Sequence, residues 1–244
     1  MRNNLSQLIS LSKVEEKLYR PADAFELSRV TRMEHVNTTI YETPQEGIAC
    51  VAARIAKLIR GREAGGQKAV LSLASGRSMR DLFVELVRLH KEEGLSFKNV
   101  VVFCTYEFYP LADLSTGSMA QIKSQLLDHV DILPENVHAI PGDLPKENIL
   151  TFCDDYEKLI ASVGGIDIQV LGIGQCGNIA MNEPGTQANS STRLVILDNN
   201  SRNDAKSLFG NAAQVPASAI TLGVDTILQA TEVVLLAFGQ HKAN

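Results

Sequence analysis

The stretch AVLSLASGRSMRDLFVELVRLHKEEG, residues 69–94, places a strand, a glycine turn and a helix in immediate succession. Residues 69–75 form an apolar run of strand length, which is typical of a parallel strand covered on both faces. Four apolar side chains then recur at helical spacing on one face: Leu82, Phe83, Leu86 and Leu89. The stretch therefore predicts one strand–helix unit of an α/β sheet.

The same alternation continues on both sides of this unit. Upstream, residues 48–59 carry a helical apolar face that ends before Gly65 and Gly66. Further strands are predicted at residues 99–104, 166–174, 192–198 and 231–239. Helical segments separate most of them, at residues 117–128, 147–162, 201–209 and 222–229. We therefore expect an α/β fold with a doubly wound, mainly parallel sheet and helices on both faces.

Composition narrows the class of protein. The 244 residues are 45% hydrophobic and carry a net charge of −5, which allows a substantial core and argues against nucleic-acid or membrane partners. No apolar run approaches the roughly 20 residues of a membrane span. The four cysteines have no zinc-site spacing, so reduced thiols in a cytoplasmic protein are expected: Cys50, Cys104, Cys153 and Cys176.

Ligands of such sheets bind beyond the carboxyl ends of the strands, so the loops there matter most. In the loop after the first strand, Gly76 lets a ligand approach the backbone, and the free amides of the next helix favour an anion. Ser75 and Ser78 offer hydroxyls, and Arg77 offers a positive charge. The alternative is a plain strand-to-helix turn, and the motif alone puts the two interpretations about level.

Three later loops also carry polar groups. Aromatic residues surround Glu107 in residues 104–111, as in a lined pocket or, more commonly, in ordinary packing. Asn178 and Glu183 follow a buried strand in a glycine-rich loop, a density that favours a site. Cys176 in the same loop is a lone thiol, which is more often inert. Lys242 follows the last strand and either binds a phosphate or lies in solvent.

These loops, in this order, resemble the glucosamine-6-phosphate deaminase (isomerase) family, whose relatives are the 6-phosphogluconolactonases. The similarity covers roughly residues 38–244, and NEPG favours the deaminases. The segments that carry it are LHKEEGLSFKNVVVF (89–103), LLDHVDILPENVH (126–138), GGIDIQVLGIG (164–174), NEPGT (182–186) and LGVDTILQATEVVLLAFGQHKA (222–243). The resemblance implies a doubly wound α/β fold and conversion of glucosamine 6-phosphate and water to fructose 6-phosphate and ammonia, without metal or cofactor.

Carried over by position, the resemblance breaks at the catalytic residues. The family's proton-moving aspartate falls on Tyr106, beside the retained acid Glu107. An aspartate falls on Cys176 and the ring-opening histidine on Asn178, while Glu183 is retained. Asparagine does not titrate, and tyrosine starts from a pKa of about 10. Since losing a general acid or base costs about 10²–10⁴-fold, these changes argue against efficient deamination.

The positions that the resemblance assigns to phosphate binding match the family better than the catalytic positions do. Residues 75–78 stand where the family has its phosphate loop, and Lys242 matches the family's phosphate lysine. The family's phosphate arginine falls near Ser207, with Lys206 beside it as a substitute. The resemblance thus implies a small sugar phosphate as partner, and it leaves room for a homo-oligomer.

Domain limits follow from the same resemblance. Residues 1–37 are predicted to be an N-terminal arm, and residues 38–244 a deaminase-like domain that stops short of the family's last helix and strand. Tyr106 and Asn178 also resemble a longer subfamily in which a de-N-acetylase-like domain follows. Three functions stay open: an amino-sugar phosphate deaminase, a non-catalytic sugar-phosphate-binding or regulatory module, and an aldose–ketose isomerase with Glu107 or Glu183 as base.

Overall fold

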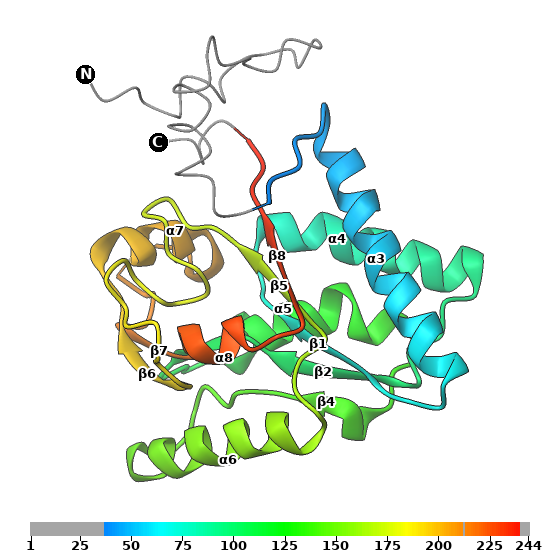
Figure 1. Ribbon diagram of the computed structural model, residues 1–244. Coiled ribbons are helices and arrows are strands. Elements are labelled where there is room, and N and C mark those ends of the chain that lie inside the picture. The colour runs from blue at the N-terminus through cyan, green and yellow to red at the C-terminus, as the bar shows by residue number, and fades with distance from the viewer. Residues whose placement is uncertain (1–36, 212, 240–244) are drawn as a thin grey trace, which may run out of the picture.

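The computed structural model describes residues 37–211 and 213–239, and a parallel sheet forms their centre (Figure 1). The sheet has the order β4-β2-β1-β5-β8, and all its neighbouring strands are parallel. Its strands are β1 (Ala69–Leu73), β2 (Val100–Cys104), β4 (Val137–His138), β5 (Ile168–Gly172) and β8 (Glu232–Leu236). The chain moves outward from β1 first on one side and then on the other, so the predicted doubly wound sheet is confirmed.

Helices cover both faces of this sheet. On one face, α3 (Pro44–Ala64) packs beside α4 (Arg77–Glu93), and α6 (Ile149–Ser162) covers the opposite face (Figure 1). The remaining helices are α5 (Ser118–Gln125), α7 (Asn199–Phe209) and α8 (Val224–Leu228). Short 3-10 turns lie at Leu114–Thr116, Leu127–His129, Pro134–Asn136 and Lys146–Asn148. None of the helices in the described ranges is long and apolar enough to cross a membrane.

A second, smaller sheet departs from the sequence prediction. It joins β3 (Tyr106–Tyr109), β7 (Ser218–Thr221) and β6 (Arg193–Ile196), all antiparallel. The prediction of a loop at residues 104–111 was therefore wrong, and residues 192–198 contribute their strand to this second sheet. Strands of four residues are too short to give a clear period in the sequence, and β3 becomes regular only because β7 pairs with it.

The core confirms the interpretation of the apolar runs. Every residue of β1 and β2 is buried, as expected for strands covered by helices on both faces. The polar side chains in this core bond to one another. Ser72 Oγ lies 3.0 Å from Thr105 Oγ1, and Gln169 Nε2 donates to Thr105 Oγ1 at 3.1 Å and to the Ser72 carbonyl at 3.3 Å. These bonds join β1, β5 and the end of β2.

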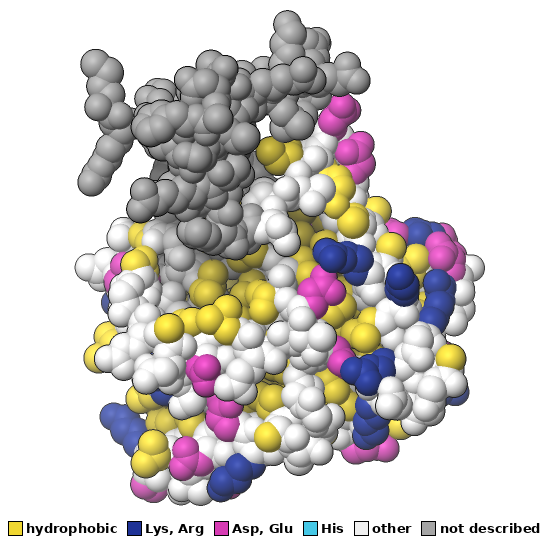
Figure 2. Space-filling view, in the orientation of Figure 1, with side chains coloured by type: hydrophobic (Ala, Val, Ile, Leu, Met, Phe, Trp, Pro, Cys, Tyr) yellow, Lys and Arg dark blue, Asp and Glu magenta, His cyan; other side chains and the backbone are white. Residues whose placement is uncertain are grey.

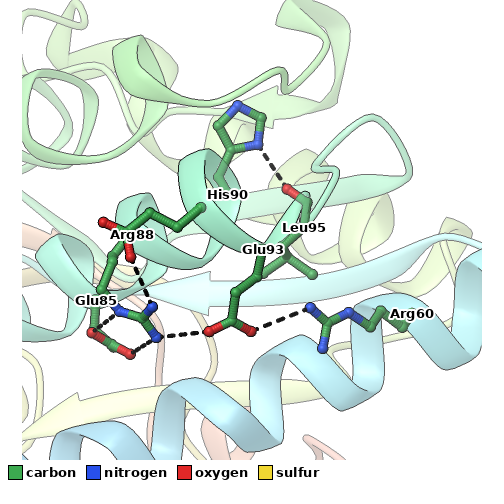
Figure 3. Close-up of polar contacts among 7 residues, drawn as sticks. Arg60, Glu85, Arg88, His90, Glu93 and Leu95 are labelled. Carbon is green, nitrogen blue, oxygen red and sulfur yellow. Dashed lines mark hydrogen bonds and ion pairs between the residues drawn. The ribbon is translucent and has the colours of Figure 1, made fainter.

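An ion network fastens the far end of α4 to α3 (Figure 3). The guanidinium of Arg88 binds Glu85 at 2.8 Å, Glu93 at 2.9 Å and Glu92 at 3.1 Å, and Glu93 also lies 3.7 Å from Arg60 of α3. The hydrogen bonds that Arg88 donates, above all the one to Glu85, raise the pKa of Arg88. Among these pairs only Glu93–Arg60 joins α4 to α3, and such exposed pairs contribute little stability each.

Strand β8 is the outer strand of the described sheet on the β5 side. On the face turned to α3, Glu232 binds Arg54 at 3.0 Å. On the other face, Val233 and Leu235 are exposed, and hydrophobic side chains gather around β8 and α8 in Figure 2. The expected homo-oligomer stays a prediction, as does the arm at residues 1–37, which apart from Asn37 lies outside the described residues.

A substitution at Gly223, just before α8, tests how closely this residue packs against the loop that leads into β6. A Cβ added at Gly223 would lie 2.0 Å from the backbone oxygen of Ser190. We expect Gly223→Ala to lower the free energy of unfolding by about 1–3 kcal/mol or more, because backbone atoms must shift. Gly61→Ala in α3 is the control: a Cβ there meets nothing within 4 Å, so a gain of about 0.5–1 kcal/mol is expected. Urea denaturation measures both, and a Gly223→Ala variant as stable as the wild type would contradict this packing.

Candidate functional site

The candidate loops meet at one edge of the central sheet. Strand β1 lies between β2 and β5, with Leu73 paired to Cys104 on one side and to Val170 on the other. The Thr105 amide donates to the Leu73 carbonyl at 3.0 Å, so the chain beyond β2 starts beside the chain beyond β1. The loop at residues 74–79, the segment at residues 104–111 that contains β3, and the loop at residues 172–186 therefore leave the sheet side by side.

Tyr106 and Ser75 form a buried pair at this edge. Their hydroxyls lie 2.9 Å apart, and the Tyr106 hydroxyl also donates to the Ser75 carbonyl at 3.2 Å. Burial raises the pKa of Tyr106 to about 12, against which the hydrogen bond with Ser75 works. The phenol is thus a neutral donor that ties β3 to the loop following β1.

Glu107 points away from Tyr106, because neighbouring residues of a strand face opposite sides. It is 3% exposed, and its carboxylate accepts the amides of Ser118 at 2.7 Å, Met119 at 2.9 Å and Phe108 at 2.9 Å. Burial raises the pKa of Glu107, while these amides lower it. Gly117 provides the space for the Glu107 carboxylate, since a Cβ at this position would lie 2.8 Å from the carboxylate oxygens. Glu107 therefore holds the first turn of α5, and the geometry does not support its role as a replacement base.

The loop after β5 holds Asn178 and Cys176. The Gly174 amide donates to the Asn178 carbonyl at 2.9 Å, and the Gly177 amide to the Gly174 carbonyl at 3.0 Å. The Asn178 side chain lies over Gly174, where an added Cβ would come within 1.8 Å of its Oδ1. Its Nδ2 donates to the Ala180 carbonyl at 3.3 Å. Cys176 is a half-buried free thiol in this turn.

Glu183 lies against the beginning of α7. Its Oε1 accepts the Ser201 hydroxyl at 2.6 Å, and the Ser201 amide bonds to Asp198 Oδ1, the cap of α7, at 2.6 Å. Glu183 Oε2 is buried and has no hydrogen-bond partner among the described residues. The neighbouring Asn182 donates to the Leu222 carbonyl at 2.9 Å and accepts from Arg193 at 2.9 Å, so it serves the fold.

A pocket of about 600 Å³ opens beside these loops. It is lined by Gly76, Arg77, Arg80, Gln121, Gln125, Gln175, Asn203, Asp204, Lys206, Ser207 and Leu208. Of the predicted phosphate residues, Gly76, Arg77 and Lys206 come together here, although α4 and α7 are far apart in sequence. Ser75 and the half-buried Ser78 are not in the lining, and Lys242 lies outside the described residues.

The sequence interpretation missed several lining residues. Arg80 lies one helical turn after Arg77, and Gln121 and Gln125 are four residues apart on α5. These spacings place each pair on one helix face, a signal that the sequence carried. Which face meets the pocket depends on how α4, α5 and α7 pack, and the spacing does not contain that information. Within the described ranges, no three His, Cys, Asp or Glu side chains are grouped to hold a metal ion.

Comparison with known proteins gives consistent matches. Residues 42–244 match the family model described as glucosamine-6-phosphate isomerases/6-phosphogluconolactonase. A putative glucosamine-6-phosphate deaminase-like protein of Bacteroides thetaiotaomicron is 50% identical over 244 residues, which are 100% of this chain and 37% of that protein. A glucosamine-6-phosphate deaminase of Bacillus pumilus is 41% identical over 197 residues, covering 79% of this chain and 78% of that one. The chain thus spans little more than a third of the first relative.

Solved structures agree on the fold. A monomeric glucosamine-6-phosphate deaminase superposes with a TM-score of 0.72 at 34% identity, covering 79% of this chain and 78% of that one. The 6-phosphogluconolactonase of Trypanosoma brucei gives a TM-score of 0.65 at 20% identity, covering 84% of this chain and 82% of that one. At 20% identity, the similarity to the 6-phosphogluconolactonase shows a shared fold and nothing more.

Tyr106→Phe tests the pair at the sheet edge. We expect the variant to lose about 0.5–1.5 kcal/mol of unfolding free energy at neutral pH, because the hydrogen bonds to Ser75 disappear. Tyr109→Phe is the matched control, because it removes one tyrosine hydroxyl from the same strand and with it a 2.7 Å hydrogen bond to the Leu144 carbonyl. Urea denaturation measures both.

The pH dependence of this loss separates the pair from ordinary packing. The folded state holds the Tyr106 proton up to a pKa of about 12, whereas the unfolded chain releases it near 10. The contribution of Tyr106 is therefore fully present below about pH 10 and is lost as pH rises towards 12. The stability difference between wild type and Tyr106→Phe should shrink over that window, and a constant difference would refute the raised pKa.

Proposed function

We propose, because the chain belongs to the glucosamine-6-phosphate isomerase/6-phosphogluconolactonase family, that it binds an amino-sugar phosphate such as glucosamine 6-phosphate. Homology to this family supports a broad class of function, that of a deaminase or isomerase acting on a sugar phosphate. The ligand would lie at the carboxyl edge of the central sheet, between the loops that follow β1 and β5. Its phosphate would enter the pocket beside α4 and α7.

The phosphate end of the pocket has the chemistry that such an ester needs. Arg77 and Lys206 supply positive charge from two helices, and a phosphate monoester carries about −1.5 to −2 near neutral pH. Gly76 precedes α4 with φ at +136°, and because glycine has no side chain, the first amides of the helix have no side-chain cap. Those amides favour an anion. Lys242 would add to this charge from the end of the chain.

The chemical end lacks a working base at the position where the family moves a proton. A base must lie near its working pH to take the C2 proton of the sugar. The Tyr106 phenol is bonded to Ser75 and has a pKa raised to about 12, and Glu107 is bonded to three backbone amides. Asn178 does not titrate. The Tyr106–Ser75 pair carries the proposal: binding of the sugar phosphate without efficient deamination.

Glu183 keeps a second candidate function open. Its Oε2 is a buried carboxylate oxygen without a hydrogen-bond partner in the described ranges. A carboxylate in that condition is able to take a proton from a ligand that reaches it. An aldose–ketose isomerase with Glu183 as base is therefore the alternative, and it predicts proton exchange where binding alone does not.

Proton NMR of glucosamine 6-phosphate in D₂O distinguishes binding without turnover from isomerisation with Glu183 as base. With the wild-type protein we expect the ligand resonances to broaden, the C2 proton to remain and no fructose 6-phosphate to form. Exchange at C2 that disappears in Glu183→Gln would establish the isomerase alternative. Unbroadened resonances at high protein concentration would refute binding of this ligand.

Back-substitution tests whether only the proton-moving groups are absent. We expect Tyr106→Asp combined with Asn178→His to bring C2 exchange above that of the wild type, because an ionised carboxylate and a titrating imidazole return to the positions that carry them in the family. Each substitution alone is the control, and should gain less, since acid and base each contribute about 10²–10⁴-fold. A folded double variant that binds the ligand without exchange would show that the scaffold itself has diverged.

A further inference from the structure

The first turn of α4 carries two arginines whose charges are not neutralised. Arg77 and Arg80 are exposed, lie one turn apart, and form no ion pair within the described residues. That turn contains no acidic residue, and Gly76 provides no side-chain hydrogen bond to its amides. Positive side chains at a helix N-terminus are unfavourable beside the positive end of the helix dipole. An anion bound in the pocket would reverse this effect.

Helix α7 lines the same pocket and adds to its positive charge. Lys206 of α7 is exposed and also forms no ion pair in the described part of the chain, whereas Asp204 is the carboxylate that the lining contains. Asp204 Oδ2 accepts the Gln175 amide at 3.3 Å. Three cations thus face the pocket against one carboxylate, a surplus that matches the charge of one phosphate monoester dianion.

Helix α5 supplies a third wall with neutral polar groups. Gln121 and Gln125 lie four residues apart on one face of the helix and line the pocket. Glu107 bonds the amides of Ser118 and Met119 and thereby holds the start of α5 in place. Each glutamine amide both donates and accepts hydrogen bonds. The wall is therefore suited to phosphate oxygens or sugar hydroxyls, and the retained acid Glu107 acts on the pocket through α5.

From these three walls we propose that Arg80 is a ligand-binding residue that selects phosphorylated over unphosphorylated sugars. Its guanidinium binds the phosphate monoester dianion together with Arg77 and Lys206, in the pocket that Gln125 of α5 also lines. Arginine suits this task, because its planar fork makes paired hydrogen bonds to phosphate oxygens. The family resemblance assigns the phosphate to residues 75–78, Lys206 and Lys242, and not to Arg80. The inference rests on the proposed function, since it names a residue of the same site.

Calorimetric titration of the full chain with three probes tests the assignment: glucosamine 6-phosphate, inorganic phosphate and unphosphorylated glucosamine. Arg80→Gln should weaken the binding of both phosphates by about 10-fold or more, because a charge-assisted hydrogen bond is lost. Arg80→Lys should lose less, since it keeps the charge without the fork. Arg60→Gln is the matched control: it removes a half-exposed arginine of α3 outside the pocket and should bind all probes like the wild type. Higher salt should weaken phosphate binding in the wild type more than in Arg80→Gln.

The outcomes separate this inference from the proposed function. If the wild type binds glucosamine 6-phosphate and Arg80→Gln, folded by circular dichroism, binds it equally well, Arg80 is not a ligand residue and the proposed function stands. If the wild type binds inorganic phosphate through Arg80 but does not bind glucosamine 6-phosphate, the anion site stands and the proposed function falls. A wild-type protein that binds neither phosphate overturns both.

Discussion

The pairing of β1 with both β2 and β5 is the constraint on which the rest of the structure depends. Because β1 is buried on both faces and parallel to both neighbours, the segments that follow β1, β2 and β5 must leave the sheet at the same edge. Even the polar groups inside this core serve the pairing: Ser72, Thr105 and Gln169 bond to one another across the strands. A buried polar group without a partner costs several kcal/mol, so this bonding favours one register of the three strands over others.

The same reasoning explains how Glu107 stabilises the fold. A buried carboxylate is costly unless it is hydrogen-bonded, and three backbone amides meet this requirement. Two of those amides begin α5, where a negative charge is favoured by the helix dipole. Glu107 therefore links β3 to the helix that forms one wall of the pocket. Under the proposed function, it would influence a ligand through the placement of α5.

Sequence patterns predicted the parts of the fold that repeat and missed the parts that depend on distant contacts. The run at residues 69–75 and the helical spacing of α4 are local, and both were confirmed. Strand β3 was missed because four residues show no clear period, and its partner β7 lies more than 100 residues later. The Tyr106–Ser75 bond joins residues 31 positions apart, and no spacing rule reaches that far. Arg80 had the right spacing from Arg77, but only the pocket that α4 lines together with α5 and α7 gives that spacing a meaning.

The energetics of Tyr106 favour the proposed binding function over proton transfer by this residue. With a pKa of about 12, ionising this phenol near pH 7 would cost about five pH units, or about 7 kcal/mol. A general base contributes about 10²–10⁴-fold, or about 3–5 kcal/mol, so the ionisation would cost more than the catalysis gains. As a neutral donor, by contrast, the same hydroxyl stabilises the loop that begins at Ser75 and leads into the arginines of α4. Under the proposed function, the position to which the family resemblance assigns proton transfer would contribute instead to the rigidity of the loop at residues 75–78, and such rigidity would increase the affinity for an anion by reducing the ordering that binding requires.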